Sequence, residues 1–431
     1  MLDPTSLRGF GTQMFLTHLE IENFRALKRV KVDLHSRANV FAGVNGAGKS
    51  TLLVAVHLHF SRYVSAMRTG RPSGRGPALK ELRAGAETVC LGAVAEHRGQ
   101  AFRWRVERTF KGLHSRTTTE DLEGFRNFIK DQQRVMDDPE HGNVPLFTTY
   151  PVSRAILDVP LRVRTRDQTR QSAAFQSTSL STARHFRSFF AWFRDREDYE
   201  NERRLDVRDY RDPQISAVRR AVACLLPGYG NLRVKRRPLR LVVTKGETEF
   251  DIENLSDGEK GLIALAGDLA RRMSLANPGL REPLTGSGIV MIDELELHLH
   301  PAWQRNALRG LLEAFPNIQF IFTTHSPQII SELQPDQIFL LKDGEAISVA
   351  RSYGMESTQV LRQLMGDPGR PLQVEEQLRA LNALIDDGRF REGEEKLEEL
   401  SRQMGDADPV LSIARTRIRR GKALRDFEAH R

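Results

Sequence analysis

Hydrophobic and polar residues alternate near the N-terminus of this 431-residue chain, and a helical period follows them. The segments FLTHLEIENF and ALKRVKVDLH each alternate, and the short apolar run ANVFAG comes next, so three strands are predicted across residues 14–41. A glycine-rich segment then leads into TLLVAVHLHFSRYVSAM, whose apolar residues recur at helical spacing. The order strand, glycine-rich loop and helix is therefore expected at the start of the chain.

The middle of the chain is less regular. Residues 68–85 are rich in Gly, Pro and Arg and indicate an exposed loop, and ETVCLGAVAEH with AFRWRVERTF predicts a two-strand meander. Residues 117–180 are mixed in character, residues 183–226 predict two or three helices, and residues 232–252 alternate as strands again.

Helical and apolar strand patterns alternate after residue 254, which indicates a mostly parallel α/β sheet. The expected elements are helices over 258–273, 301–315 and 328–333, and strands over 289–292, 319–322 and 338–341. From residue 355 onward the chain is charged and helical in pattern, so it is expected to pack on the sheet domain or on a partner.

Composition narrows the class of protein. Hydrophobic residues make up 39% of the chain, and no run approaches the ~20 apolar residues that cross a bilayer. The N-terminus lacks a basic stretch followed by an apolar one, so no secretory signal is expected. Cys90 and Cys224 are the only cysteines, which is typical of a reducing compartment. We therefore expect a cytoplasmic protein without membrane contact.

The net charge of +9 makes polyanions candidate partners. Fifteen basic residues face eight acidic ones between Arg184 and Arg240. Of the 65 basic residues only twelve are Lys, however, and a GC-rich genome gives the same excess of Arg. The charge alone therefore leaves nucleic-acid binding open.

Residues 43–51, GVNGAGKST, match the phosphate-loop pattern G-x-x-x-x-G-K-[ST]. Glycines let backbone N–H groups turn toward phosphates at a helix N-terminus, Lys49 adds a positive charge for the β- and γ-phosphates, and the Ser50 hydroxyl suits Mg²⁺. ATP and Mg²⁺ are the expected cofactors. A chance glycine loop is the alternative, but it would not require a strand before it and a helix after it. The residues expected to bind the nucleotide here are Gly43, Asn45, Gly46, Gly48, Lys49, Ser50 and Thr51.

The segment GIVMIDE, residues 288–294, is an apolar strand that ends in two acids. Asp293 can hold Mg²⁺ together with Ser50, and Glu294 can orient and deprotonate the attacking water. Strands often end in acidic residues, so this pattern alone is weak evidence for a catalytic site. It becomes stronger evidence because the chain also contains a phosphate loop.

The segment LSDGEK, residues 255–260, opens a helix, and Ser256 with Glu259 forms a capping-box pattern that explains it structurally. The same residues resemble the ABC ATPase signature L-S-x-G-E/Q. That resemblance implies that Ser256 and Gly258 of one subunit close over the γ-phosphate bound by another. His325, in FTTHSP, follows an apolar strand, where a histidine is usually a loop residue; here it resembles the ABC switch histidine, which contacts the γ-phosphate.

Two matches are similar to the SMC/RecF/OLD branch of ABC ATPases: Asn45 within the loop and IENFR at residues 21–25, where Arg25 is implied to reach the nucleotide. ELELHLHP, residues 294–301, is similar to the D-loop region of that branch. Its two histidines are not spaced like a zinc site, so we expect them to be structural or interfacial. No Q-loop glutamine is identifiable, although FTTYPVSR, residues 147–154, lies where one is expected.

Residues 192–201 and 353–366 resemble compact bacterial defence ATPases, the PtuA-like proteins of Septu and retron systems, although those are often longer. The resemblance implies an ATPase that acts against phage with a separate HNH-type nuclease and that self-associates through its heads as a dimer or a higher even-numbered assembly. No acidic cluster of a TOPRIM nuclease, no HNH pattern and no long heptad run stands out, so nuclease activity is expected in the partner and not in this chain.

We therefore expect an α/β fold, an ABC-type P-loop ATPase head with a mixed sheet, a helical insertion and a helical C-terminal tail. The expected segments are the N-terminal part of the head (1–66), head strands with a variable insertion (67–182), a basic helical insertion (183–230), the C-terminal part of the head (231–350) and the tail (351–431). The expected function is the ATP-hydrolysing sensor of a defence system. The alternatives are a RecF-like DNA-binding ATPase and a nucleotide-gated protein–protein switch.

Overall fold

The computed structural model describes residues 13–111, 114–138, 140–152, 170–176, 182–366 and 370–429. The chain divides into two compact units, unit 1 over Met1–Val360 and unit 2 over Leu361–Arg431. Within the described ranges, none of the helices combines the length and the hydropathy that a membrane span requires.

Unit 1 is built on an eleven-stranded mixed sheet in the order β6-β5-β4-β1-β2-β14-β13-β3-β12-β11-β7. The strands are β1 (Met14–Phe24), β2 (Leu27–Asp33), β3 (Ala38–Ala42), β4 (Thr88–His97), β5 (Gln100–Lys111), β6 (His114–Glu120), β7 (Leu146–Tyr150), β11 (Gly288–Ile292), β12 (Ile318–Thr324), β13 (Ile338–Lys342) and β14 (Glu345–Ser348). Strands β13, β3, β12, β11 and β7 are parallel, whereas β6, β5, β4, β1 and β2 pair antiparallel. The expectation of an α/β fold with a mixed sheet is confirmed.

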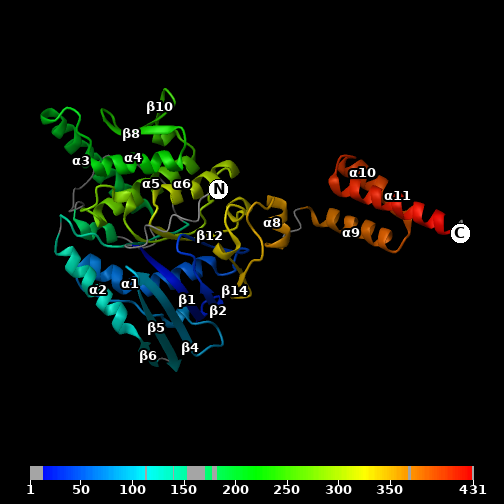
Figure 1. Ribbon diagram of the computed structural model, residues 1–431, viewed down its shortest axis with the longest axis horizontal. Coiled ribbons are helices and arrows are strands. Elements are labelled where there is room, and N and C mark those ends of the chain that lie inside the picture. Colours follow the sequence, from blue (N-terminus) through cyan, green and yellow to red (C-terminus); the bar gives the residue numbers. More distant parts are fainter. Residues whose placement is uncertain are drawn as a thin grey trace. The chain divides into compact units, whose positions relative to one another are not determined.

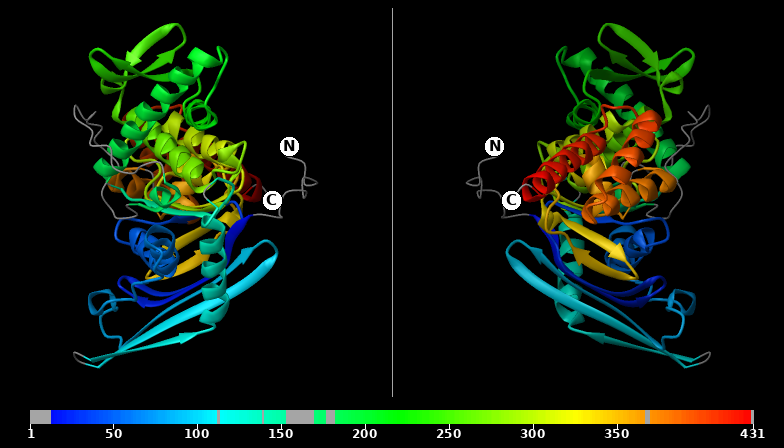
Figure 2. Two further views of the ribbon diagram at one scale, coloured as in Figure 1. Left: turned by 90° about the vertical axis from the view of Figure 1, so that its left-hand side faces the viewer. Right: turned by 90° about the vertical axis from the view of Figure 1, so that its right-hand side faces the viewer.

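The sheet curves around helix α1 (Lys49–Thr69). Strand β1 contacts β11 and β12 although these strands are far apart in the strand order, and α1 contacts strands of both halves (Figure 2). The buried amide of Gln319 on β12 accepts a hydrogen bond from Leu16 N and donates one to Leu16 O, both at 2.8 Å, which joins the two halves. Because α1 is enclosed in this way, it is apolar around most of its circumference.

Helix α5 (Asp257–Ala276) contacts β7 of the parallel part of the sheet, and further helices pack around it (Figure 1). Helix α4 (Pro213–Leu225) packs on α5 and on α6 (Pro301–Ala314), and α3 (Thr182–Asp206) packs on α5. Asp212 caps α4 by accepting from Gln214 N and Ile215 N, and Pro213 takes the first helical position, where its missing N–H costs nothing. A second sheet, β8 (Tyr229–Arg236), β9 (Leu239–Lys245) and β10 (Thr248–Asp251), packs against α4 through β8.

Strand β6 and helix α2 (Leu122–Met136) lie in the region that showed no clear pattern in the sequence, and the short strand β14 was not predicted either. All seven residues of β6 are exposed, so they carry no hydrophobic alternation. Helix α2 buries Leu122, Phe125, Phe128 and Ile129 against α1 and β5, at the three- to four-residue spacing of an amphipathic helix that the sequence analysis did not recognise.

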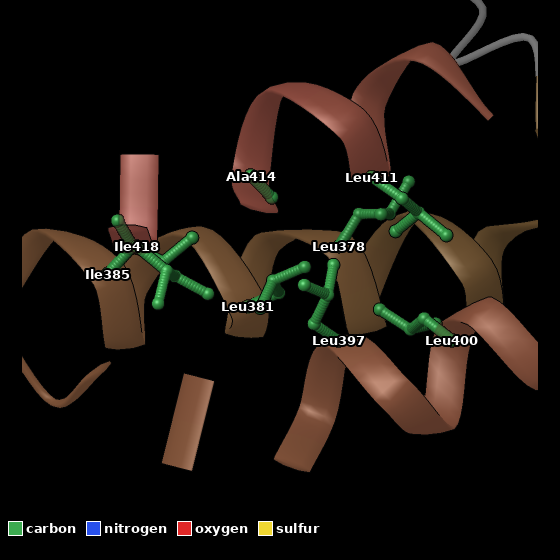
Figure 3. Packing of buried hydrophobic residues seen from close by; sticks show 8 residues of the cluster. All are labelled: Leu378, Leu381, Ile385, Leu397, Leu400, Leu411, Ala414 and Ile418. Atoms are coloured by element: carbon green, nitrogen blue, oxygen red, sulfur yellow. The ribbon is translucent and has the colours of Figure 1, made fainter. Parts of the chain in front are cut away.

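Unit 2 contains α9 (Leu372–Asp386), α10 (Phe390–Met404) and α11 (Pro409–Ala429), and α8 (Ser357–Gln363) spans the division between the units. Figure 3 shows the hydrophobic core of unit 2, which is formed by Leu378, Leu381, Ile385, Leu397, Leu400, Leu411, Ala414 and Ile418. These residues recur every three or four positions along each helix, so each helix turns one apolar stripe toward the other two. Unit 2 therefore has a core of its own.

Candidate nucleotide-binding site

The carboxyl ends of four neighbouring parallel strands meet at one edge of the sheet. Thr324 at the end of β12 pairs with Ala42 at the end of β3, and Ile292 at the end of β11 pairs with Phe322 on β12 and with Tyr150 on β7. The glycine loop (43–48) therefore begins beside His325 and beside the two acids that follow β11. In open α/β sheets, ligands bind at this edge.

The glycine loop has the geometry of a phosphate cradle. Gly46 and Gly48 adopt φ values of +83° and +100°, which residues with a side chain rarely adopt, and a Cβ on Gly43 would lie 2.8 Å from the Leu341 carbonyl oxygen. No side chain of the described residues caps the N-terminus of α1, so its first N–H groups can bind an anion.

Lys49 is buried, and its ammonium group donates to the carbonyl oxygens of Gly43 at 2.9 Å and Val44 at 3.3 Å. The charge is thus held inside the loop at the point where phosphate oxygens would bind. Asn45, Gly46 and Ser50 are exposed, and Thr51 is half-buried.

Thr323 on β12 links the two acids that follow β11. Its hydroxyl donates to a carboxylate oxygen of Asp293 and accepts from Glu294 N at 2.9 Å. Asp293 is buried, and its own N–H donates to Tyr150 O at 2.8 Å. Glu294 has a φ of +46°, a conformation that costs energy for a residue with a side chain and is frequent at functional sites. Thr323 was not singled out from the sequence.

His325 lies against two carboxylates. Its Nδ1 is 3.9 Å from Glu294 Oε1 and 3.3 Å from Glu296 Oε1, and its backbone N–H donates to Glu296 Oε1 at 2.7 Å. Glu296 is buried, whereas the side chain of His325 is 47% exposed. The two residues predicted to be catalytic therefore lie together, and Glu296 orients one of them. In the sequence, Glu296 could have been noticed because it follows Glu294 by two residues in the alternating segment ELEL.

The signature segment forms the capping box that its sequence allows. The Ser256 hydroxyl donates to Glu259 Oε2 at 2.7 Å, and a Cβ on Gly258 would lie 2.5 Å from the His298 carbonyl oxygen. Burial raises the pKa of Glu259, but hydrogen bonds from Tyr229 and Ser256 outweigh it and hold this pKa below its ordinary value. Ser256 itself is exposed, so its predicted contact with another subunit's γ-phosphate stays a prediction.

Arg25 lies next to the glycine loop but is bound to another residue. Its guanidinium is 2.9 Å from Glu81, whose side chain is fully buried. The following Ala26 and Leu27 lie beside Gly48, since a Cβ there would be 3.6 Å and 2.8 Å from their side chains. The predicted contact of Arg25 with the nucleotide therefore stays a prediction.

The segments 294–301 and 147–154, which were expected to form the D-loop and Q-loop regions, contact neighbouring helices. His300 caps α6, because its Nδ1 accepts from Ala302 N at 3.3 Å, and no cluster of three metal-ligating residues occurs among the described residues. Strand β7 ends at the site edge, but the Tyr150 hydroxyl donates to Asp268 on α5 at 3.0 Å. Residues 153–154 of the expected Q-loop region lie outside the described residues.

Comparisons with known proteins match both halves of this site. A family model described as "AAA ATPase domain" matches residues 14–88, which contain the glycine loop. A second, described as "AAA domain, putative AbiEii toxin, Type IV TA system", matches residues 157–331, which contain the signature segment, both acids and His325.

Two curated relatives are named for defence systems. The "Retron Ec83 probable ATPase" of Escherichia coli is 28% identical over 84% of this chain and 78% of its own length. The "Septu protein PtuA" of Bacillus mycoides (strain KBAB4) is 39% identical over 22% of this chain and 13% of its own length. A solved SMC head domain from Thermotoga maritima covers 78% of this chain and 98% of its own at 17% identity and a TM-score of 0.43, which is too low to add to the argument. The chain is therefore a P-loop ATPase that is similar to the ATPases of retron and Septu defence systems.

Proposed function

We propose that this ATPase hydrolyses ATP with Mg²⁺ at the edge formed by β3, β12 and β11. The observation that carries the proposal is that the Thr323 hydroxyl donates to Asp293 and accepts from Glu294 N, which ties both acids to β12, the neighbour of the strand that leads into the glycine loop. Lys49 and the N-terminus of α1 bind the phosphates. The Ser50 hydroxyl and the Asp293 carboxylate are a donor set that fits Mg²⁺, which takes few protein oxygens and keeps several waters. Glu294 activates water, and His325, held by Glu296, contacts the γ-phosphate.

We propose that a second copy of the chain completes this site. Ser256 is exposed at the N-terminus of a 20-residue helix, where the helix dipole favours an anion. Ser256 and Gly258 of one copy would cap the nucleotide held by the glycine loop of the other. Two nucleotides per pair of heads then favour even-numbered assemblies.

Three variants test the proposed site. Glu294→Gln should keep ATP binding, reduce turnover by about 100-fold or more and increase dimerisation, because ATP stays bound. Lys49→Ala should lose nucleotide binding, and Ser256→Arg should keep binding but lose turnover. The control is Glu313→Gln at an exposed position of α6. Normal turnover in Ser256→Arg would refute the contribution from a second copy. Equal, very slow turnover in the wild type and Glu294→Gln would favour the protein–protein switch.

We further propose that the ATPase is the sensing subunit of an anti-phage system and acts with a separate HNH-type nuclease. The support is the identity to a retron ATPase over most of both chains and the local identity to PtuA. The test is purification of the tagged chain from its native operon and a phage challenge with wild type and Lys49→Ala. If no second protein co-purifies and Lys49→Ala protects as the wild type does, this role is refuted.

The RecF-like alternative depended on the basic segment between Arg184 and Arg240, whose charges are largely paired. Carboxylates pair there with Arg194, Arg196, Arg204, Arg219, Arg220, Arg233, Lys235, Arg236 and Arg240. Paired arginines release fewer counterions from DNA, so this segment favours nucleic acid less than its sequence suggested. ATP-dependent, salt-sensitive binding of duplex DNA would restore this alternative.

A further inference from the structure

A cavity of about 290 Å³ lies away from the nucleotide edge, between α1 and one face of the β4–β5–β6 sheet. Figure 1 shows α1 and α2 beside these strands. The register places Leu91, Val106 and Thr119 side by side, so the sheet turns one continuous face toward α1. The volume is near the lower end of the range for small-molecule sites, roughly 300–1,000 Å³.

The loop over residues 70–78 forms one wall of the cavity and is fastened on both sides. Ser61 on α1 accepts from Arg75 N at 3.1 Å, and the Ser65 hydroxyl lies 2.7 Å from that of Ser73. On the sheet side, the Arg108 guanidinium donates to Pro77 O at 2.7 Å. Hydrogen bonds to α1 and to β5 therefore fix the position of the loop that forms this wall of the cavity.

The charge lining this cavity has one sign. Arg62, Arg75 and Arg108 line it, and no Asp or Glu is among its lining residues in the described part of the chain. An anion would meet Arg62 together with two guanidinium groups that already have partners, Arg75 at Glu81 and Arg108 at Pro77 O. Guanidinium groups form strong charge-assisted hydrogen bonds to phosphate or carboxylate oxygens.

The inner wall combines apolar surface with polar groups that lack partners. Leu58, Leu91 and the buried Trp104, whose ring stacks on Phe125, supply apolar surface. Both ring nitrogens of the buried His59, the indole nitrogen of the buried Trp104 and Nε of Arg108 have no hydrogen-bond partner among the described residues. A buried polar group without a partner lowers stability, so such groups gathered at one cavity indicate that a ligand can supply the missing partners.

We propose that this cavity binds a small planar organic anion of the class of nucleoside monophosphates. The heterocycle lies against the apolar wall, with Thr117 and Thr119 lining the opposite side of the cavity on β6. The phosphate lies at the three arginines. This site is separate from the glycine loop and takes a second, smaller ligand.

The cavity is connected to the nucleotide edge by one buried carboxylate. Glu81, with no exposed side-chain surface, pairs with both Arg75 and Arg25. Arg25 begins the turn whose next two residues lie against Gly48 of the glycine loop. A ligand that draws Arg75 away from Glu81 would change how Arg25 is held, so occupancy of the cavity would alter ATP turnover.

The test is calorimetric titration of the full chain with AMP, GMP, CMP and UMP after the glycine loop has been saturated with Mg²⁺ and a non-hydrolysable ATP analogue. Inorganic phosphate and adenosine are titrated in parallel. We expect saturable binding of at least one monophosphate at one site per chain, with weaker binding of adenosine and of phosphate. No saturable binding of any monophosphate, or phosphate binding as tightly as the monophosphates, would overturn the proposal.

Two variants locate the site. Arg62→Ala should weaken monophosphate binding by about 10-fold or more, because it removes one charged partner. The matched control is Arg68→Ala, at an exposed position of the same helix outside the cavity, which should bind as the wild type does. Thr119→Phe on the exposed strand β6 should fill the cavity and abolish binding while the chain stays folded by circular dichroism. Unchanged binding in both Arg62→Ala and Thr119→Phe would refute the location.

Discussion

The proposed chemistry depends on the hydroxyl of Thr323, because this group contacts both acids that follow β11. It donates to Asp293 and accepts from Glu294 N, so Thr323→Val keeps the shape of the residue but leaves a buried carboxylate and a backbone N–H without this partner. We expect a loss of about 1–3 kcal/mol in the free energy of unfolding. We also expect a fall in kcat of roughly 10- to 100-fold with little change in KM, because the acids lose their positions and the phosphate loop does not.

Thr148 on β7 supplies the matched control for Thr323→Val. It is equally buried in a neighbouring part of the same sheet, but its hydroxyl has no hydrogen-bond partner among the described residues. Thr148→Val should therefore leave turnover unchanged and keep or slightly raise stability in urea denaturation. If the two variants behave alike, Thr323 does not position the acids.

The pH dependence of stability should report on His59. Burial lowers the pKa of His59 from 6.5 to about 3 in the folded chain. Below pH 6.5 the unfolded chain therefore takes up a proton that the folded chain does not, and stability is lost as the pH falls from 6.5 toward 3. At about pH 5.5 this one residue should cost about 1.4 kcal/mol relative to about pH 7.5. His59→Phe should remove that part of the pH dependence in urea denaturation at the two pH values. Identical pH dependence in both proteins would show that His59 does not stay neutral.

At the scale of elements, the sequence predicted those parts whose signal is local. The glycine loop, the strand before it and the helix after it were recognised because glycines, a lysine at fixed spacing and apolar periodicity are all local features. Strand β6 was missed because its pairing with β5, and not its own side chains, holds it in the sheet. The close approach of β1 to β12 was also not predictable, because Gln319 and Leu16 are 303 residues apart in sequence.

The same difference separates the residues of the proposed site that the sequence named from those that it did not name. Lys49 and Asp293 belong to patterns, so the sequence names them directly. Glu296 and Thr323 act by holding His325 and Asp293, and such roles depend on which strands are neighbours. The role of Ser256 depends on a second subunit, and a single chain does not test it, so it stays a prediction.

Asp268 ties the signature helix to the sheet. On α5 it is almost fully buried with Arg271 and Arg272, and its carboxylate also accepts from Tyr150 at the end of β7. Asp268→Asn should lower the free energy of unfolding by about 3–5 kcal/mol, because two buried guanidinium groups lose their carboxylate. The control is Asp257→Asn, 75% exposed in the first turn of the same helix, which should cost less than about 1 kcal/mol. Similar urea midpoints for the two variants would contradict a structural role for this cluster.

At the scale of the whole molecule, the chain divides after Val360 into two units, and we expect each unit to have its own free energy of unfolding. Unit 1 contains the proposed nucleotide site, so ATP with Mg²⁺ should stabilise it by mass action. Unit 2 has a small core of leucines and isoleucines on three helices, and small domains bury a smaller share of their surface. The two units should therefore unfold at different temperatures, and only one transition should respond to nucleotide.

Leu381→Ala tests this independence. Leu381 is 1% exposed in the core of unit 2, so its truncation should cost about 2–5 kcal/mol, enough to lower the melting of a small unit by many degrees. Differential scanning calorimetry should then show the minor transition at lower temperature, while the major transition and its rise with ATP and Mg²⁺ stay as in the wild type. Leu372→Ala, 74% exposed on the same helix, is the control and should change neither transition. A single transition that both Leu381→Ala and ATP shift would mean that the two units unfold as one, and a signal could then pass between them through shared stability.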